Sequence, residues 1–171
     1  MTDTYRSLDE KPFEAHYLFE DIVIDAPPEH IWPLALRIGS WMDAHRLETI
    51  DGHEGEVGHF ERVYPRGLGD ETPLPHYHVY GVGFLVPNKY IGLEVMSERG
   101  GSYGAEREYI SFDGITLADR GDGTTNVSFL MADAQLGSRA ESVDERGALI
   151  EGAHAQIRGN LETLKALAEA N

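Results

Sequence analysis

Apolar and polar residues alternate over residues 17–25, a spacing that predicts a β-strand. One face of this strand carries three aliphatic residues and one acid: Leu18, Glu20, Ile22 and Ile24. The segment Ala26-Pro27-Pro28-Glu29 then favours a helix start, because proline suits the first turn and an acid there meets the helix dipole. We expect a short helix that Gly39 ends, followed by a second one running from Ser40 through Trp41 to His45.

The middle of the chain predicts further strands separated by turns. We expect them at residues 47–50, 57–64, 77–86, 90–96, 105–117 and 124–131. Because the 105–117 segment is long, we expect a bulge at Asp113-Gly114, with a hairpin turn there as the alternative. Residues 65–75 are rich in proline and glycine and predict a loop that can act as a lid or mouth.

The last segment predicts one long amphipathic helix over residues 143–170. Its apolar stripe contains Ile150, His154, Ile157, Leu161, Leu164 and Ala168. The fold class that follows is α+β: a curved antiparallel sheet of about seven strands wrapped on this helix, with two short helices after the first strand. A sheet that curls around a helix is hard to fill, so we expect an internal cavity. Residues 1–15 predict a flexible arm, and residues 16–171 predict a single domain.

The amino-acid composition limits the kinds of partner and site that we expect. The chain has 14 basic and 30 acidic residues, a net charge of −16, which disfavours nucleic acid and anionic membranes. It has no cysteine, so disulfides and thiolate metal sites are excluded. We see no signal peptide or membrane-spanning run and expect a cytoplasmic protein. A homodimer stays open, since a second subunit is one way to order the 1–15 arm.

Three segments of the chain carry a resemblance to a known fold family. They are residues 22–32 at the first strand and helix start, the spacing of Gly52, Gly55 and Gly58, and Asp122-Gly123-Thr124-Thr125 followed by the long helix. Together they resemble the helix-grip fold of the START/Bet v 1-like (SRPBCC) superfamily, which includes polyketide cyclases and aromatases. The resemblance covers about residues 17–170 and implies a mostly apolar cavity for a hydrophobic or aromatic molecule. It names no reaction, because this fold hosts carriers, receptors and enzymes.

Glu20 and His154 are candidate catalytic residues. If the face of Glu20 lines the cavity, burial makes its carboxyl group a usable general acid or base. The alternative is that Glu20 lies near solvent and pairs with an arginine. His154 lies on the apolar stripe of the long helix, where it either exchanges protons with a ligand or is a packed core histidine. We expect Gln156 and Arg158 to be solvated.

The strand around residue 80 offers a second set of candidates. His76, His78 and Tyr80 share one face, with Phe84 further along it. Two histidines at this spacing suit a metal, an acid–base role at the cavity mouth, or a plain solvent-facing edge. Residues 79–85 contain no acid to complete a metal site, so we assign no metal and no cofactor. His78 is the residue we select as catalytic, and Tyr80 and Phe84 as ligand-binding.

The remaining candidates are aromatic or lie near the short helices. Tyr109 can donate a hydrogen bond to a ligand carbonyl or oxyanion, which makes it our fourth catalytic candidate. Phe112 lies on the other face of the same strand, and which face is inward is left open. The short helices close one end of the cavity in the family that the chain resembles, which implies that Trp41 and His45 lie there and that Trp41 stacks on an aromatic ligand. The helix stripe adds Ile150 and Ile157 as ligand-binding residues.

Two functions fit these residues. The first is a cofactor-free lyase or cyclase that acts by acid–base catalysis on an aromatic or polyketide-like molecule. The second is a carrier that binds a hydrophobic or lipid-like ligand without converting it. An enzyme should bring two ionisable groups within hydrogen-bond reach, whereas a carrier needs only one polar anchor in an apolar sleeve.

Overall fold

The structure is a computed structural model that describes residues 16–42, 44–65, 78–98, 107–133 and 143–170. The expected arm at 1–15 and the expected loop at 65–75, apart from Pro65, lie outside these residues. The elements follow the chain as β1 (His16–Ile24), α1 (Pro28–Ala35), α2 (Ile38–Trp41), β2 (Ala44–Asp51), β3 (Phe60–Pro65), β4 (His78–Val86), β5 (Tyr90–Glu98), β6 (Arg107–Asp119), β7 (Thr125–Asp133) and α3 (Val143–Glu169).

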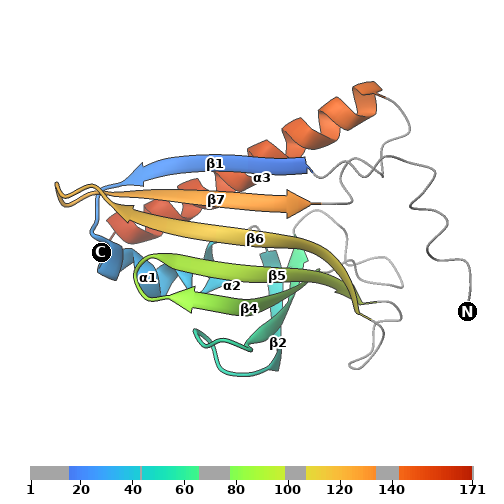
Figure 1. The fold of residues 1–171 in the computed structure, drawn as a ribbon, viewed down its shortest axis with the longest axis horizontal. Helices are drawn as coiled ribbons and strands as arrows, with labels where there is room; N and C mark the ends of the chain where they lie inside the picture. The colour runs from blue at the N-terminus through green and yellow to red at the C-terminus, as the bar shows by residue number, and fades with distance from the viewer. Residues whose placement is uncertain (1–15, 43, 66–77, 99–106, 134–142, 171) are drawn as a thin grey trace, which may run out of the picture.

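All seven strands join one antiparallel sheet in the order β1-β7-β6-β5-β4-β3-β2. Consecutive strands from β2 to β7 are neighbours, and β1 closes the order by pairing with β7. The helix α3 packs against β1, β7, α1 and α2, so it lies on one side of the sheet (Figure 1). We call the side that packs against the helices the inward face and the opposite side the outward face.

The core forms between the inward face and the helices. Its fully buried members come from both layers: Leu18, Ile24, Ile31, Trp41, Val82, Leu93, Ile115, Phe129, Ile157, Leu161 and Leu164. The period-two pattern of β1 is confirmed, since Leu18 and Ile24 are buried while Tyr17 and Phe19 are exposed. The predicted α+β helix-grip architecture, with its long final helix, is therefore confirmed.

The region around the short helices differs from the sequence-based prediction. Gly39 does not end the first helix, which stops at Ala35; it lies inside α2. Ser40 does not begin a helix either, and its hydroxyl donates to the backbone oxygen of Arg37 at 2.7 Å. The second helix ends at Trp41, so His45 belongs to β2. The strand β2 begins at Ala44, before the start of the strand predicted at 47–50, and it forms one edge of the sheet.

Register shifts in the middle of the sheet, in β4 and β6, set which of their side chains face inward. The first lies between Val82 and Phe84 of β4, and the second is opposite the Val95–Met96 step, where Ser111 and Tyr109 are successive partners. The predicted bulge at Asp113-Gly114 is wrong, because Leu93 pairs with Asp113 and Gly92 with Gly114 in continuous register. The predicted strand start at residue 57 is also too early. Gly55 and Gly58 have positive φ, which keeps this segment a loop until Phe60.

The first bulge corrects one predicted ligand contact. Val82 pairs with Leu93 on the inward face, but Phe84 pairs with Gly92 on the outward face and is 55% exposed. A bulged residue shifts the alternation by one, so Phe84 no longer shares the face of Tyr80. Phe112 is likewise outward and exposed, because the inward alternation of β6 runs through Asp113, Ile115 and Leu117. Neither phenylalanine lines the inward face.

No described helix is long and apolar enough to cross a membrane.

Candidate functional site

The inward face combines apolar side chains with a small number of ionisable ones. Strand register places Leu18, Glu20 and Ile22 of β1 opposite Met131, Phe129 and Val127 of β7. Further across the sheet, Val82 and Leu93 lie in the same layer as the apolar residues of β6 and β7. Among the described residues, the polar members of this face include Glu20, His59, Glu61, Tyr80 and Asp113, with His154 opposite on α3. A molecule held against this face can therefore contact polar side chains at several positions.

The structure brings Glu20 and His154 together from opposite ends of the chain. Their contact, Nδ1 of His154 to Oε1 of Glu20, measures 2.7 Å. The His154 side chain is 30% exposed and the Glu20 side chain 18%, so their contact is partly shielded from solvent. The hydrogen bond places the histidine proton on Nδ1 and leaves Nε2 as the nitrogen that can accept a proton.

Arg158 completes this group, four residues beyond His154 on α3. Its Nε lies 3.2 Å from Oε2 of Glu20 and its terminal nitrogen lies 3.3 Å from Oε1. The expectation that Arg158 is solvated is confirmed, since 59% of its side chain is exposed, and its pairing with Glu20 adds to that expectation. The alternative in which Glu20 pairs with an arginine is confirmed, whereas a cavity beside its inward-facing carboxylate stays a prediction. We call Glu20, His154 and Arg158 the Glu20 cluster.

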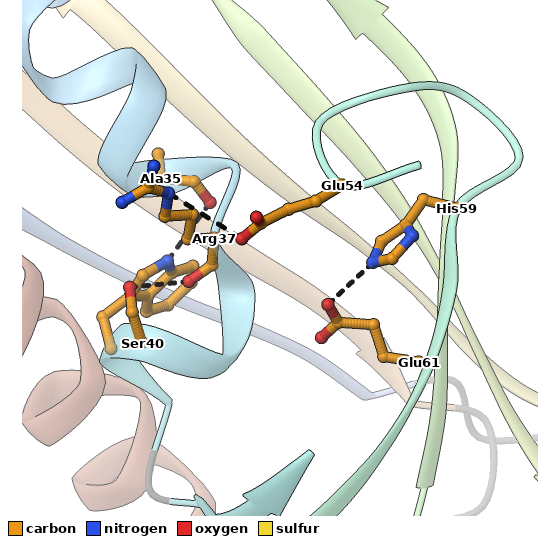
Figure 2. A network of polar contacts seen from close by, with 7 residues as sticks. Ala35, Arg37, Ser40, Glu54, His59 and Glu61 are labelled. Atoms are coloured by element: carbon orange, nitrogen blue, oxygen red, sulfur yellow. Dashed lines mark hydrogen bonds and ion pairs between the residues drawn. The ribbon is translucent and has the colours of Figure 1, made fainter. Parts of the chain in front are cut away.

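A second acid–imidazole pair lies at the start of β3. Nε2 of His59 and Oε1 of Glu61 are 2.7 Å apart, and the two residues are only 2% and 8% exposed. Figure 2 shows both side chains on the side of β3 where α1 and α2 lie. The backbone of His59 is held beside the core, because the Val82 amide donates to its carbonyl oxygen at 2.9 Å. Sequence reasoning missed this pair, although its i and i+2 spacing was a usable signal.

Asp113 is the other inward acid that the sequence did not select. It is fully buried on β6 between Leu93 of β5 and Met131 of β7. The signal was its alternation with Ile115 and Leu117, which the expected bulge at this position concealed.

The outward face of β2 and β3 holds a different network. Arg62 and Tyr64 each contact the carboxylate of Glu48, at 3.2 and 3.0 Å. Burial, and then the hydrogen bond to Glu48, raises the pKa of Tyr64 above its usual value, so its hydroxyl stays protonated and donates. Arg46 lies over the Tyr64 ring, 4.6 Å from its centre. These residues link two strands and face away from the helices.

Three predicted site residues are located only by their backbones. His78 pairs with Val63 of β3, and Tyr109 pairs with Met96 of β5. His45 lies in β2 where the register shifts between Ala44 and Arg46. Their side chains lie outside the described part of the structure, as does the whole of His76, so their assigned roles stay predictions.

The predicted ligand-binding residues that remain are distributed over the core. Trp41 is almost fully buried, donates its indole N–H to the Ala35 carbonyl at 3.1 Å and meets Phe129 edge-on. Tyr80 lies opposite Glu61 in the sheet and, like Ile150, is half-buried against the core. Ile157 is fully buried in it. Trp41 and Ile157 are thus core residues first, and their contact with a ligand stays a prediction.

An open groove lies elsewhere, between the start of α1 and the β4–β5 turn. Its volume is about 590 Å³, and its walls include Pro28, Val86, Tyr90 and Leu117. Neither acid–imidazole pair lines it, so we do not take it as the reaction site. In the described part of the chain, no three metal-ligating side chains gather at one point.

Comparison with known proteins supports the fold. No protein-family profile and no curated protein sequence matches the chain. Solved structures do: the ZhuI aromatase/cyclase from Streptomyces sp. R1128 has a TM-score of 0.63 at 12% identity, covering 91% of this chain and 94% of that one. Ara h 8.0201 has a TM-score of 0.62 at 13% identity, covering 92% and 100%. The Aha1 dimer from Colwellia psychrerythraea has a TM-score of 0.58 at 17% identity, covering 88% and 93%.

Proposed function

We propose that this protein, which has the START/Bet v 1-like helix-grip fold, binds an aromatic or polyketide-like molecule between its inward face and α3 and catalyses proton transfer on it. The reaction class is that of a lyase or cyclase. The observation that carries the proposal is the 2.7 Å contact between His154 and Glu20. Two ionisable groups within hydrogen-bond reach on a mainly apolar face are what acid–base catalysis needs and what a passive carrier does not.

The chemistry follows from the geometry of the Glu20 cluster. Glu20 orients the imidazole through Nδ1, so Nε2 of His154 takes the proton from a C–H bond beside a ligand carbonyl. The electron pair of that bond forms a carbon–carbon double bond, the π electrons of the carbonyl move onto its oxygen to give an enolate, and the Glu20 carboxylate stabilises the imidazolium that forms. Arg158 holds the second oxygen of Glu20 and so fixes the carboxylate. Tyr109 and His78 keep their predicted roles, steadying the oxyanion and exchanging a proton, as part of this proposal.

A carrier without turnover is the second candidate. The solved Ara h 8.0201 and ZhuI structures both share the fold of this chain. The fold therefore does not distinguish an enzyme from a carrier. What favours the carrier is the apolar majority of the inward face. The Glu20 cluster would then be the single polar anchor.

The test uses α-tetralone, an aromatic ketone with exchangeable protons beside its carbonyl group. Wild type is incubated with it in D₂O, deuterium incorporation is followed by NMR, and binding is followed by the melting temperature. We expect the wild type to exchange deuterium faster than buffer alone does. The exchange rate should fall at least about tenfold in His154→Gln, and the fall should be smaller in Glu20→Gln. His53→Gln, an exposed histidine of the β2–β3 connection, is the matched control and should exchange as wild type does.

Each result decides between the candidates. Binding without faster exchange would favour the carrier. Absence of binding by α-tetralone and by a wider aromatic panel would overturn the inward face as a ligand site. The cytoplasmic location and the homodimer are part of the same proposal, and native mass spectrometry of the purified protein tests the dimer and any retained molecule together.

A further inference from the structure

The His59–Glu61 pair has capacity for hydrogen bonding that the described residues do not use. Each side chain makes one contact to the other, through Nε2 and Oε1. Their remaining atoms, Nδ1 of His59 and Oε2 of Glu61, are buried and have no hydrogen-bond partner within the described structure. Glu20 provides the contrast, because His154 and Arg158 occupy both of its oxygens. Buried polar atoms are normally hydrogen-bonded, so Glu61 is built to meet a partner from outside the chain.

The protonation of the pair identifies what kind of partner it meets. The hydrogen bond of the pair is donated either by the imidazole to the carboxylate or by the carboxylic acid to the imidazole. In either case the shared proton lies between Nε2 and Oε1. Oε2 of Glu61 therefore remains an acceptor in either state, and it calls for a group that donates a hydrogen bond.

The surroundings of Glu61 set the rest of the partner's chemistry. Its neighbour in the sheet is Tyr80, and the adjoining layer is made of the buried Val82 and Leu93. The Glu61 side chain extends from β3 toward the side where α1 and α2 lie (Figure 2). A molecule that reaches Oε2 here is enclosed by apolar groups and places one polar atom on the carboxylate. An aromatic or enolic ring that bears a hydroxyl group has this composition.

We propose that Glu61 is a hydrogen-bond acceptor for a phenolic or enolic hydroxyl of the bound molecule, and that His59 is its positioning residue. This inference rests on the proposed function, because it requires a ligand on the inward face. It adds a specificity element: the protein distinguishes hydroxylated aromatic molecules from their ethers and hydrocarbons. The hydroxyl donates to Oε2, while the hydrogen bond from Nε2 keeps the carboxylate in place.

The test measures the affinity of three probes by calorimetry: 2-naphthol, 2-methoxynaphthalene and naphthalene. Only the first can donate a hydrogen bond. Wild type should bind 2-naphthol about tenfold more tightly than the ether, the size expected of a hydrogen bond to a charged or strongly polar acceptor. In Glu61→Met this preference should fall to about twofold or less, whereas a preference caused by the bulk of the methyl group would persist. Glu94→Met, on the outward face beside Gly83, is the control and should keep the wild-type preference.

The role of His59 is tested by a conservative rescue. His59→Gln retains an N–H near the position of Nε2 and should keep most of the preference, while His59→Phe should lose it. If Glu61→Met does not fold, the double variant His59→Phe/Glu61→Met removes both polar partners and replaces them with apolar groups of similar size.

Three outcomes settle the proposal. Loss of the 2-naphthol preference in Glu61→Met, with its retention in the control, supports it. Equal binding of 2-naphthol and the ether by wild type, or an unchanged preference in Glu61→Met, overturns the Glu61 subsite and leaves the proposed function standing. Failure of all three probes to bind wild type overturns the proposed ligand site itself, and the subsite with it.

Discussion

The energetics of the Glu20 cluster can be measured by removing its members singly and in pairs. Three substitutions replace a polar side chain with an apolar one of similar size: Glu20→Met, His154→Phe and Arg158→Met. The contacts predict unequal coupling. The His154–Glu20 hydrogen bond has a partly buried charged acceptor, and such bonds contribute about 1.5–3 kcal/mol. The Arg158 side chain is 59% exposed, so solvent screens its ion pair to about 0.2–1 kcal/mol.

The double-mutant cycle therefore has a definite expected result. Glu20→Met and His154→Phe should each lower the free energy of unfolding by about 2 kcal/mol, and the double variant should lose about 2 rather than 4. The coupling between Glu20→Met and Arg158→Met should stay near 0.5 kcal/mol. Urea unfolding at neutral pH gives these values, and for a chain of this size each kcal/mol lowers the melting temperature by about 2–4 °C.

One pattern would refute the reasoning. If the effects of Glu20→Met and His154→Phe simply add, the two side chains do not form a hydrogen bond in solution. His154 would then lack an orienting partner, and the proposed general base would lose its structural basis. A coupling to Arg158 larger than that to His154 would instead make Glu20 a surface ion-pair residue.

Three further predictions concern the fold. Phe129→Ala should cost about 3–5 kcal/mol, because Phe129 is fully buried against Trp41, whereas Phe84→Ala should cost under about 1 kcal/mol if the β4 bulge turns Phe84 outward; urea unfolding compares them. Gly52→Ala should be destabilised more than Gly121→Ala. Both glycines have positive φ, but a Cβ at Gly52 would lie 2.5 Å from the Gly58 carbonyl oxygen, whereas one at Gly121 would meet no atom within 4 Å. Equal unfolding free energies of the two variants would contradict this geometry. The Asp25 amide, and then Lys165, lowers the pKa of Glu169 below its ordinary 4.5, so this stabilisation is present above that pH and is lost as the pH falls through the lower folded-state pKa; Glu169→Gln should be less stable than wild type at pH 7, and the difference should disappear in acid unfolding curves.

Local periodicity was enough to predict most of the fold. The alternation in β1 and the helical stripe of α3 both come from residues close in sequence, and each pattern has a single packing solution. Once both faces are fixed, Glu20 and His154 must point into the same layer. That is why these two site residues could be selected from the sequence, although their direct contact could not.

The parts that could not be predicted depend on pairing between strands. A bulge is defined by which residues are partners across the sheet, and Gly83, which lies at the β4 bulge, does not by itself show that the alternation shifts there. Phe112 was misassigned for the same reason, since the face of β6 was open until its register was known. The His59–Glu61 pair was missed although a strand over 57–64 puts both residues on one face, because the sequence does not show which face of that strand is inward.

The two acid–imidazole pairs differ in which atom they leave available, and this difference bears on function. Each imidazole uses one ring nitrogen in its pair, but the Glu20 carboxylate has partners on both oxygens, whereas the Glu61 carboxylate has one oxygen without a partner in the described structure. The first arrangement suits the removal of a proton, and the second suits the recognition of a hydroxyl. Glu20 and Glu61 lie on β1 and β3, five steps apart in the sheet order, or about 24 Å along the sheet surface. Residues so far apart contribute independently unless something bridges them. Additive effects of His154→Gln and Glu61→Met on the exchange reaction would mean separate contacts, whereas coupling that appears only with a larger hydroxylated aromatic ketone would place both pairs on one bound molecule.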